Sequence, residues 1–301
     1  MAIGGLDIGS TGAKITVVNG DGNVIHTGYL SYPVSRATGA HEVDAGKIWS
    51  TVCGLLRDAA KAVRELSIIG VTSFGESFVL TNENGEALLP TMLYTDPRGG
   101  EEAEQLRAEL TDETVFRIAG VTPHAMFTLP KLMWIKAHRH EFYQKAKHVL
   151  LIADYVAFRL TGERIIDYSL AARTMGFDIR ALKWSRRIFS AAGIDENLFS
   201  TPVPCGTVAG TVKAGLAREL GLPGNMKVVV CGHDQVAAAI GSNAMFPGDA
   251  ANGAGTVECV TPVFSGIPEN HGLLTGHYPI IPFVRKGLFC CYAFSFTGGS
   301  L

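Results

Sequence analysis

The chain has 301 residues, 47% of them hydrophobic, and its 26 basic and 28 acidic side chains give a formal net charge of −2. Domains commonly hold about 150 residues, so this length indicates two domains, and the apolar content excludes a disordered chain. The charges are mixed along the chain and lack the basic surface that binds nucleic acid or anionic lipid. We therefore predict neither nucleic acid nor membrane as a partner.

The cellular compartment is predicted from the absence of a membrane helix and of a signal peptide. No apolar run reaches the roughly 18 residues of a membrane helix. The N-terminus MAIGGLDIGS lacks the basic and apolar regions of a signal peptide, so we predict a cytoplasmic protein. The six cysteines show no zinc spacing and mostly lie in apolar runs, which predicts buried reduced thiols rather than disulfides or metal ligands.

The first elements alternate between strands and a helix. Three strands in a meander are expected at Ala2–Leu6, Ala13–Val18 and Val24–Tyr32. A helix capped by Asp44 follows and continues to Glu65, because apolar residues recur there at helical spacing. Ser67–Ser73 is a short apolar run typical of a buried parallel strand. This order predicts an α/β domain.

The middle of the chain is mainly helical. Residues 99–148 are expected to be helical, with a helix that starts at Pro130. Val149–Arg159 is expected to form one further element and Asp167–Ile179 an irregular segment. Two helical patterns in residues 185–221 are separated by the predicted loop TPVPCGTVAG. Lys227–Cys231 then predicts a strand and Gln235–Gly241 a helix.

The pattern breaks at Asn243–Gly248, which divides the chain into predicted domains of residues 1–244 and 245–301. After the break a strand at Asp249–Ala251, a loop at residues 252–256 and a strand at Val257–Phe264 repeat the opening layout, a weak sign of internal duplication. Leu288–Phe296 predicts a strand, and residues 297–300 lead into a helix start just before the chain ends. We therefore expect the second domain to be mostly absent.

Two glycine-rich loops suggest phosphate binding. Asp7-Ile8-Gly9-Ser10-Thr11-Gly12 places a carboxylate beside backbone amides that glycine leaves uncovered. Such a loop holds a phosphate while the aspartate holds Mg²⁺ directly or through water, although an ordinary hairpin turn explains the same residues equally well. Gly253-Ala254-Gly255-Thr256 offers a second loop of this kind, which taken alone favours a turn. As a pair, the two loops indicate closure on one polyphosphate from opposite domains.

Acidic residues near the strand ends are the candidates for chemistry. Asp234 follows an apolar strand and precedes a helix, which places its carboxylate where α/β folds bind ligands. It can cap the helix, and it can also accept the proton of an attacking hydroxyl. Glu76 and Asp96, with Arg98 nearby, flank strands of the first domain. Most such residues are solvated turn groups, but a hydroxyl-rich substrate needs buried carboxylates.

Several segments, in order, resemble the FGGY family of carbohydrate kinases. GGLDIGSTGAKITVV is similar to the family's first phosphate loop and NGAGTVE to its second. HEVDAGKIW resembles the entry to its first helix, MFTLPKLMWI a helical signature, and DYSLAARTMGFDI the segment Asp-Tyr-Ser/Thr-x-Ala-Ser-Arg-Thr-Met. VVVCGHDQVAAAIG resembles the strand-to-helix turn with the catalytic aspartate. The resemblance covers nearly the whole chain.

This resemblance implies an α/β, actin-like ATPase (ribonuclease H-like) fold of two lobes, the second truncated, with ATP and Mg²⁺ in the cleft. A sugar or polyol would be the small-molecule substrate. Asp234 would be the general base and would contact the substrate, and Asp7 would be the magnesium-linked carboxylate. Glu76, Asp96 and Gln235 would hold substrate hydroxyls. The implied phosphate-binding residues are Gly9, Ser10, Thr11, Gly255 and Thr256.

Departures from the family pattern leave the substrate open. Glycerol kinases have Arg-Glu and xylulose kinases Met-His where this chain has Gly75-Glu76, which disfavours both assignments. The Gly-His-Asp turn and the loop Gly255–Glu258 look more like deoxysugar kinases. The oligomeric state also stays open, a homodimer included. Because the family's adenine site lies beyond residue 301, we expect residues 1–301 alone to bind ATP poorly and to turn over little.

An alternative from another class is a nucleotide-dependent switch or sugar-sensing protein on the same fold, without phosphoryl transfer. The two hypotheses differ at Asp234, because a switch needs no general base that faces a hydroxyl pocket.

Overall fold

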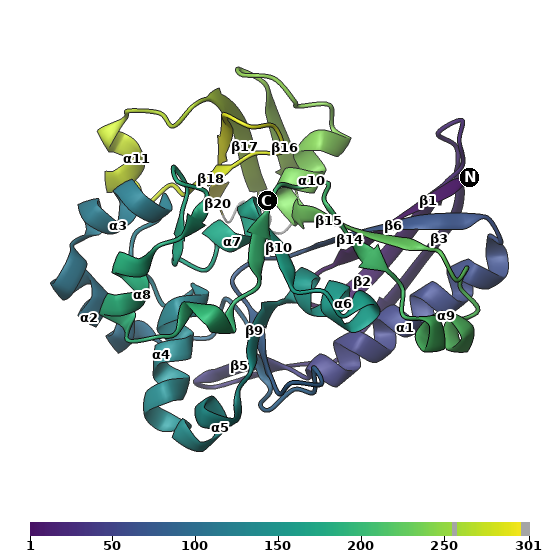
Figure 1. Ribbon diagram of the computed structural model, residues 1–301. Coiled ribbons are helices and arrows are strands. Elements are labelled where there is room, and N and C mark those ends of the chain that lie inside the picture. The colour runs from purple at the N-terminus through teal and green to yellow at the C-terminus, as the bar shows by residue number, and fades with distance from the viewer. Residues whose placement is uncertain (255–257, 296–301) are drawn as a thin grey trace.

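The computed structural model describes residues 1–254 and 258–295. A six-stranded sheet of order β14-β15-β6-β1-β2-β3 forms the centre of the N-terminal part (Figure 1). Its strands are β1 (Ala2–Ile8), β2 (Gly12–Val18), β3 (Val24–Ser31), β6 (Leu66–Ser73), β14 (Val208–Thr211) and β15 (Lys227–His233). The strands β1, β6 and β15 run parallel, and the other neighbours are antiparallel. The predicted meander and buried strands are confirmed, with Asp7 and Ile8 in β1 rather than in the loop.

The three parallel strands end together at one edge of this sheet. Ile8 of β1 pairs with Ser73 of β6, and Ser73 pairs with His233 of β15. The chain therefore leaves the three strands side by side, with Asp234 as the first residue after β15. Ligands of open α/β sheets bind beyond the carboxyl ends of the strands, so a site is expected at this edge.

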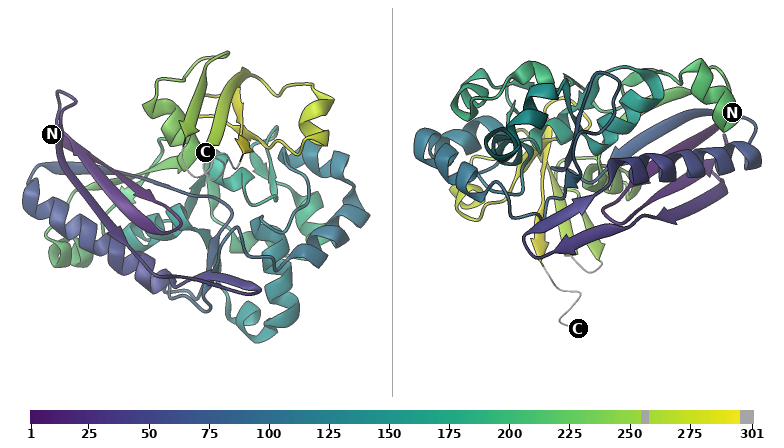
Figure 2. Two further views of the ribbon diagram at one scale, coloured as in Figure 1. Left: turned by 180° about the vertical axis from the view of Figure 1, so that it is seen from behind. Right: turned by 90° about the horizontal axis from the view of Figure 1, so that it is seen from below.

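The helices that pack against the sheet include α1 (Ala45–Ala62), α6 (Ile152–Thr161) and α10 (Asp234–Gly241). Asp44 caps α1 as predicted and accepts the N–H of Gly46 at 2.6 Å, but the helix ends at Ala62 instead of Glu65. The buried apolar face of α1 contacts β2 and β3, along which Figure 2 shows the helix lying. Burying each large apolar side chain stabilises the fold by about 1.5–3 kcal/mol.

The predicted helical segment, residues 99–148, forms four separate helices, which lie at the left of Figure 1. They are α2 (Gly100–Leu110), α3 (Asp112–Ala119), α4 (Thr128–His138) and α5 (His140–Lys145). The predicted start of α4 at Pro130 was wrong. The helix begins at Thr128, because proline fits throughout the first turn, where no N–H has an acceptor within the helix.

Other predictions are also corrected. Residues 149–159 are two elements, strand β9 (His148–Leu151) followed by α6. Residues 167–179, predicted irregular, contain α7 (Tyr168–Ala172), because Asp167 caps its first turn. The predicted loop at 201–210 supplies β13 (Thr201–Val203) and part of β14. The remaining helices of this part are α8 (Arg186–Ala192), η1 (Glu196–Leu198) and α9 (Ala214–Leu220).

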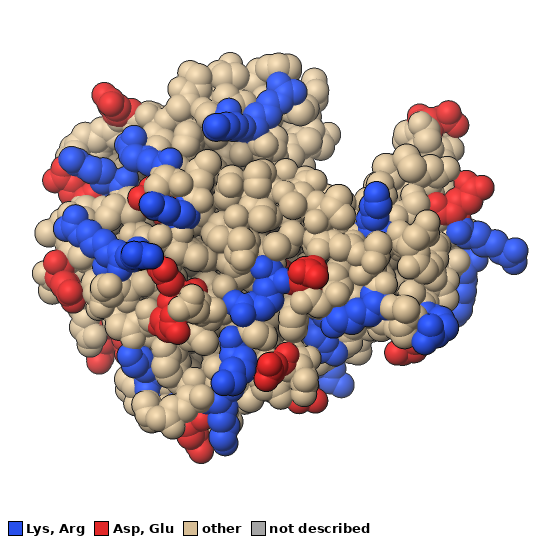
Figure 3. All heavy atoms as spheres, viewed as in Figure 1, with Lys and Arg blue, Asp and Glu red and all other residues tan. Residues whose placement is uncertain are grey.

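Small sheets complete the N-terminal part. One joins β4 (Val34–Ala37), β5 (Ala40–Val43) and β8 (Thr91–Met92), and the others pair β7 (Phe78–Thr81) with β9, β10 (Ile165–Asp167) with β13, and β11 (Phe177–Asp178) with β12 (Lys183–Trp184). On the face drawn in Figure 3, basic and acidic side chains are intermixed. In the described part of the chain, no helix is long and apolar enough to cross a membrane.

A second sheet follows α10 and lies at the top of Figure 1. It contains β16 (Ala250–Ala254), β17 (Glu258–Ser265), β18 (Ile280–Pro282), β19 (Leu288–Cys291) and β20 (Ala293–Ser295), with α11 (His271–Thr275) before β18. Asn252–Ala254, predicted as loop, pair with Glu258–Val260 instead. The single strand predicted at Leu288–Phe296 is interrupted at Tyr292, whose buried ring stacks on His233 at 4.9 Å.

Candidate active site

Two aspartates meet at the carboxyl edge of the central sheet. Asp7 lies in β1 opposite Lys14 of β2, and Asp234 is the first residue of α10. Burial raises the pKa of Asp7 and the charge of Asp234 raises it further, whereas Lys14 lowers it. The structure thus brings together the positions that the sequence predicted for the metal-linked carboxylate and the base.

The β1–β2 loop with Gly9, Ser10 and Thr11 lies directly beyond Asp7. The N–H of Gly9 donates to the carbonyl of Gly12 at 2.9 Å. Tyr32 holds the loop from the other side, because its N–H donates to the Thr11 carbonyl at 3.2 Å and its hydroxyl donates to the Gly9 carbonyl. Burial and the nearby charge of Asp7 raise the pKa of Tyr32, so its hydroxyl stays protonated and remains a donor. The conformation of the loop is therefore fixed by the protein itself.

The turn that presents Asp234 is held on both sides. Thr72 donates its hydroxyl to the Gly232 carbonyl at 2.7 Å, and the His233 N–H donates to the Ser169 hydroxyl oxygen at 2.9 Å. Gly232 has φ +87°, and a Cβ there would lie 3.1 Å from Ser169 Oγ. Glycine is required at this position, because other L-residues rarely adopt that φ and the space is occupied.

The ring of His233 has two neighbours that compete for one nitrogen. Its Nδ1 accepts the N–H of Gln235 at 3.2 Å, which caps α10, and lies 2.9 Å from Oδ1 of Asp234. An unprotonated Nδ1 that accepts from Gln235 cannot also donate to Asp234. Within the described residues, Oδ1 of Asp234 is buried and receives no hydrogen bond. This oxygen is free to accept a proton from a ligand.

Glu76 is also at this edge, but its carboxylate already has a partner. The Nε of Arg173 donates to Glu76 Oε1 at 2.5 Å, and Nη2 of Arg173 pairs with the same oxygen. Glu76 has the unusual φ of 63°, which Thr128 stabilises by donating its hydroxyl to the Glu76 carbonyl at 2.7 Å. Both charged side chains are buried. A Cβ at Gly75 would approach both Arg173 and His233 to 3.0 Å or less, so this pair lies one glycine away from the Asp234 turn.

Asp96, predicted to bind substrate, lies in a closed network. Its side chain is 0% exposed, and its two oxygens accept from the His41 N–H at 2.8 Å and from the Arg98 guanidinium at 2.6 and 2.9 Å. These donors hold the pKa of Asp96 below its usual range, despite burial. Lys131 donates to the Asp96 carbonyl at 2.6 Å. The carboxylate is thus closed to solvent with its acceptors used internally, and its predicted contact with substrate stays a prediction.

The second hairpin approaches the site through Gln235. A Cβ at Gly253 would lie 4.0 Å from Gln235 Oε1, and α10 contacts both β16 and β17. Gly255 and Thr256, the predicted phosphate-binding residues of this hairpin, lie outside the described residues. The described parts of both hairpins therefore converge on the start of α10.

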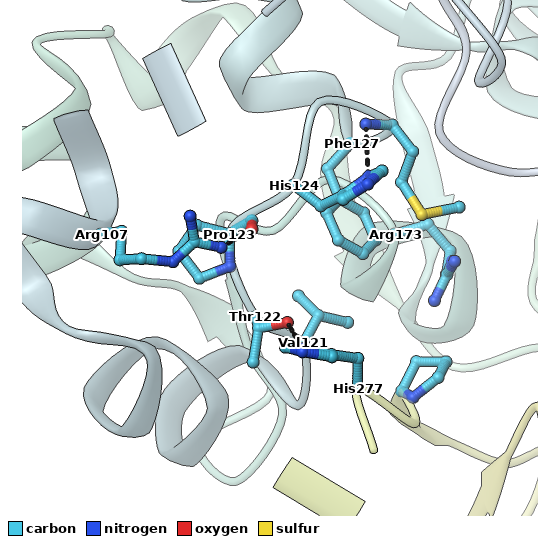
Figure 4. Close-up of a pocket in the computed structure, with 10 residues that line it drawn as sticks. Arg107, Val121, Thr122, Pro123, His124, Phe127, Arg173 and His277 are labelled. Atoms are coloured by element: carbon cyan, nitrogen blue, oxygen red, sulfur yellow. Dashed lines mark hydrogen bonds between the residues drawn. The ribbon is translucent and has the colours of Figure 1, made fainter. Parts of the chain in front are cut away.

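A cavity of about 330 Å³ lies beside Arg173, and the sequence did not predict it. Figure 4 shows His124, Arg173 and His277 around the same space. His277 Nδ1 lies 2.9 Å from the hydroxyl of Thr122, which joins the segment after α11 to the segment before α4. The sequence prediction assigned no role to Arg173, which the structure places both in the cavity wall and in the ion pair with Glu76; its signal in the sequence was the segment DYSLAARTMGFDI.

Comparison with known proteins establishes the family. The model of the N-terminal domain of the FGGY family of carbohydrate kinases matches residues 2–241. This chain belongs to the FGGY family of carbohydrate kinases. Relatives within the family include a gluconokinase of Bacillus subtilis (strain 168), 28% identical over 255 residues, which are 84% of this chain and 50% of that protein. An autoinducer-2 kinase of Photorhabdus laumondii is 30% identical over 262 residues, with 83% and 49% covered. The chain thus spans about half the length of the curated relatives it matches.

Solved structures of FGGY carbohydrate kinases share the fold. A xylulose kinase from Rhodospirillum rubrum superposes with a TM-score of 0.93 at 24% identity, over 100% of this chain and 62% of that one. A Plasmodium falciparum glycerol kinase solved with ADP gives a TM-score of 0.90 at 19% identity, with 99% and 62% covered. The predicted actin-like fold is confirmed.

The FGGY chain offers a suitable place for a divalent cation. The charges of Asp7 and Asp234 repel each other, and the positive charge of Lys14 acts on Asp7 in the opposite direction. Mg²⁺ is commonly bound by one or two carboxylates plus phosphate oxygens. Among residues 1–254 and 258–295, no group of three or more His, Cys, Asp or Glu side chains is arranged as a metal cage. The residues therefore fit a cation that arrives with a phosphate ligand. Of the cysteines, which were predicted to be buried thiols, Cys53, Cys290 and Cys291 are buried, whereas Cys205, Cys231 and Cys259 are only partly buried.

Proposed function

We propose that this protein is an ATP-dependent carbohydrate kinase that transfers the γ-phosphoryl group of ATP to a hydroxyl of a sugar or polyol. The observation that carries this proposal is the meeting of Asp7 and Asp234 at the shared edge of β1, β6 and β15, beside a loop that Tyr32 holds in place. Family membership supports the reaction class.

In the proposed reaction Asp234 is the general base. The acceptor hydroxyl oxygen forms a bond to the γ-phosphorus, its proton passes to the Asp234 carboxylate, and the bond from phosphorus to the β–γ bridging oxygen breaks to release ADP. Oδ1 of Asp234 suits this role because it is buried, has no donor in the described structure and is carried on a turn fixed by Thr72 and Ser169.

Asp7 is the residue that would hold Mg²⁺, with the Gly9–Thr11 loop against the phosphates. When bound, the cation neutralises phosphate charge. Gly255 and Thr256 stay predictions for the second phosphate loop. Gln235 stays a predicted substrate contact, and Glu76 would act through Oε2, the carboxylate oxygen that Arg173 does not engage. Asp96 would affect substrate binding indirectly, by holding neighbouring groups such as the Arg98 guanidinium in place.

The close packing around Gly75 leaves no space for the arginine that glycerol kinases have at this position. A Cβ at Gly75 would lie 2.8 Å from His233 Cδ2 and 3.0 Å from Arg173 Cγ, so an arginine side chain does not fit there. The chain therefore needs a different set of groups for its acceptor than the Arg-Glu pair of glycerol kinases. The predicted cytoplasmic location and the predicted division at residue 244 remain part of this proposal.

The test uses the protein at its full natural length. ADP release is measured from ATP and Mg²⁺ with a panel of ketoses, polyols, deoxysugars and sugar acids, for the wild type and for Asp234→Asn. We expect the variant to lose several orders of magnitude in kcat while acceptor binding by calorimetry changes little. Asp58→Asn, at an exposed position of α1, is the matched control and keeps full activity. Phosphorylation that survives in Asp234→Asn contradicts the assignment of the base, and acceptor binding without any phosphorylation favours the switch or sensor.

A further inference from the structure

The side chains around the cavity beside Arg173 indicate which chemical class of acceptor it binds. This inference rests on the proposed kinase function. Its volume of about 330 Å³ is at the lower end of the range for small-molecule sites. Arg173 forms its buried end, and the exposed His124 and His277 lie at its mouth. Figure 4 shows these three side chains reaching the cavity from different segments of the chain.

Arg173 has a hydrogen-bond donor to spare at the buried end. Its Nε and Nη2 are both used by Oε1 of Glu76. Its Nη1 is buried and has no acceptor in the described part of the structure, although the side chain is only 5% exposed. Leaving a buried charged donor unpaired is costly, so a ligand acceptor at this position would be favoured. The guanidinium is held rigidly, because the rings of Phe127 and Tyr292 lie 5.1 and 5.4 Å from it.

His124 supplies a second donor at the mouth. Its Nδ1 accepts the N–H of Met126 at 3.1 Å, so in the neutral ring the proton is on Nε2. Burial and the cations Lys131 and Arg107, together with His277, lower the pKa of His124, which keeps the ring neutral near pH 7. The Nε2–H group is then a donor.

Acceptor groups are scarce in the cavity wall. No aspartate or glutamate is among its described lining residues. The other arginine of the wall, Arg107, is occupied by Asp112, Glu104 and the Pro123 carbonyl. A hydroxyl group needs a partner for its proton as well as a donor, whereas a carboxylate only accepts hydrogen bonds. The Arg173–Glu76 pair is neutral as a whole, so net charge does not select the ligand. The donors of the wall select it instead, because they suit a carboxylate better than a hydroxyl group.

We propose that the acceptor is a sugar acid, and that Arg173 and His124 bind its carboxylate. Arg173 and His233 both pack closely against Gly75, so the Arg173 end of the cavity neighbours the turn that presents Asp234, and a ligand whose carboxylate binds Arg173 brings its hydroxyl-bearing carbons to the same edge of the sheet. Charge-assisted hydrogen bonds from an arginine to a carboxylate are among the stronger ones in proteins. Arg173 is thus the residue that determines specificity for the acid.

The test compares aldonates with alditols of the same length and stereochemistry, which carry CH₂OH in place of the carboxylate. Calorimetric titration of five- and six-carbon pairs into the full-length protein gives the two dissociation constants. We expect the best aldonate to bind about tenfold or more tightly than its alditol. An alditol that binds as tightly as its aldonate overturns the proposal.

Two variants test whether Arg173 and His124 cause the preference for the aldonate. Arg173→Lys keeps a cation for Glu76 but loses the spare Nη1, and His124→Ala removes the donor at the exposed mouth. Each should reduce the aldonate affinity about three- to tenfold and leave the alditol affinity within about twofold. His140→Ala on exposed α5 is the matched control and leaves both affinities unchanged. If Arg173→Lys does not fold, His124→Ala decides, and an aldonate preference that persists in His124→Ala overturns the proposal.

The ADP-release assay distinguishes failure of this inference from failure of the kinase proposal. Turnover with neutral acceptors and none with aldonates overturns the sugar-acid inference and leaves the kinase standing. An Arg173-dependent aldonate preference without ADP release from any acceptor supports the binding site and contradicts the kinase.

Discussion

The substitution Gly75→Ala tests how tightly the site is packed. The added Cβ would lie 2.8 Å from His233 Cδ2, 2.9 Å from His233 Nε2 and 3.0 Å from Arg173 Cγ. Non-bonded carbon atoms prefer about 3.5–4.0 Å, so the overlap is about 0.5–1 Å at each contact. Neither neighbour can move freely, because His233 and Arg173 are 7% and 4% exposed and are held by Tyr292 and Glu76.

The expected cost follows from this overlap. Overpacking of this size destabilises by about 1–3 kcal/mol, which lowers the melting temperature by about 2–10 °C. His233 precedes Asp234, and a displacement of about 1 Å at a catalytic group costs about a hundredfold in rate. Thermal melting and kcat/KM of the full-length protein measure both effects.

Gly5→Ala is the matched control, because a Cβ at Gly5 has no atom within 4 Å among the residues described. We expect it to melt at or slightly above the wild-type temperature and to keep full activity. Equal melting temperatures and equal rates for the two alanine variants would refute the packing argument and with it the close approach of Arg173 and the Asp234 turn.

Three further predictions concern buried and paired charges. Burial raises the pKa of Asp154, so the contribution of this group to stability is present below about pH 4 and is lost as the pH rises. In thermal melts at a series of pH values, Asp154→Asn should therefore melt a few degrees higher than wild type at pH 8 and show no gain at pH 4. Arg98→Met leaves the carboxylate of Asp96 buried and unpaired and should cost about 3–5 kcal/mol in urea unfolding, whereas Arg117→Met on the surface should cost about 1 kcal/mol or less. Asp7→Asn should weaken Mn²⁺ binding in the presence of ADP at least tenfold, measured by titration; unchanged binding would remove Asp7 from the metal site.

Much of the fold follows from local sequence patterns. The meander β1–β3 and the strand β6 were predicted because alternating or continuous apolar runs end at glycine-rich turns. Asp44 marked the start of α1 because its carboxylate caps the first N–H groups, a purely local interaction. The helices of residues 99–148 were not separated in the prediction, since their ends depend on how each turn packs against the rest of the protein.

The parts of the candidate site that the sequence could predict are those that depend on one residue type and its position relative to a strand. Asp7 lies near the end of β1 and Asp234 directly follows β15, and the sequence assigned both. The partner of Glu76 could not be found this way, because Arg173 is 97 positions further along the chain. Thr122 and His277, which join two walls of the cavity, are 155 positions apart. Contacts of this kind depend on tertiary packing, which no local pattern encodes.

The same edge of the sheet concentrates negative charge at a cost to stability. Burial raises the pKa values of Asp7, Asp154 and Asp167, and the charge of Asp234 adds to the effect at Asp7. Asp167 belongs to the support of the site, since it accepts from Ser169, which in turn holds the His233 N–H. A ligand that brings a divalent cation to Asp7 relieves the repulsion only in the folded state, and binding of this kind stabilises a protein by mass action. The charges that weaken the site on its own are therefore the ones that would couple folding to binding of the proposed metal and nucleotide.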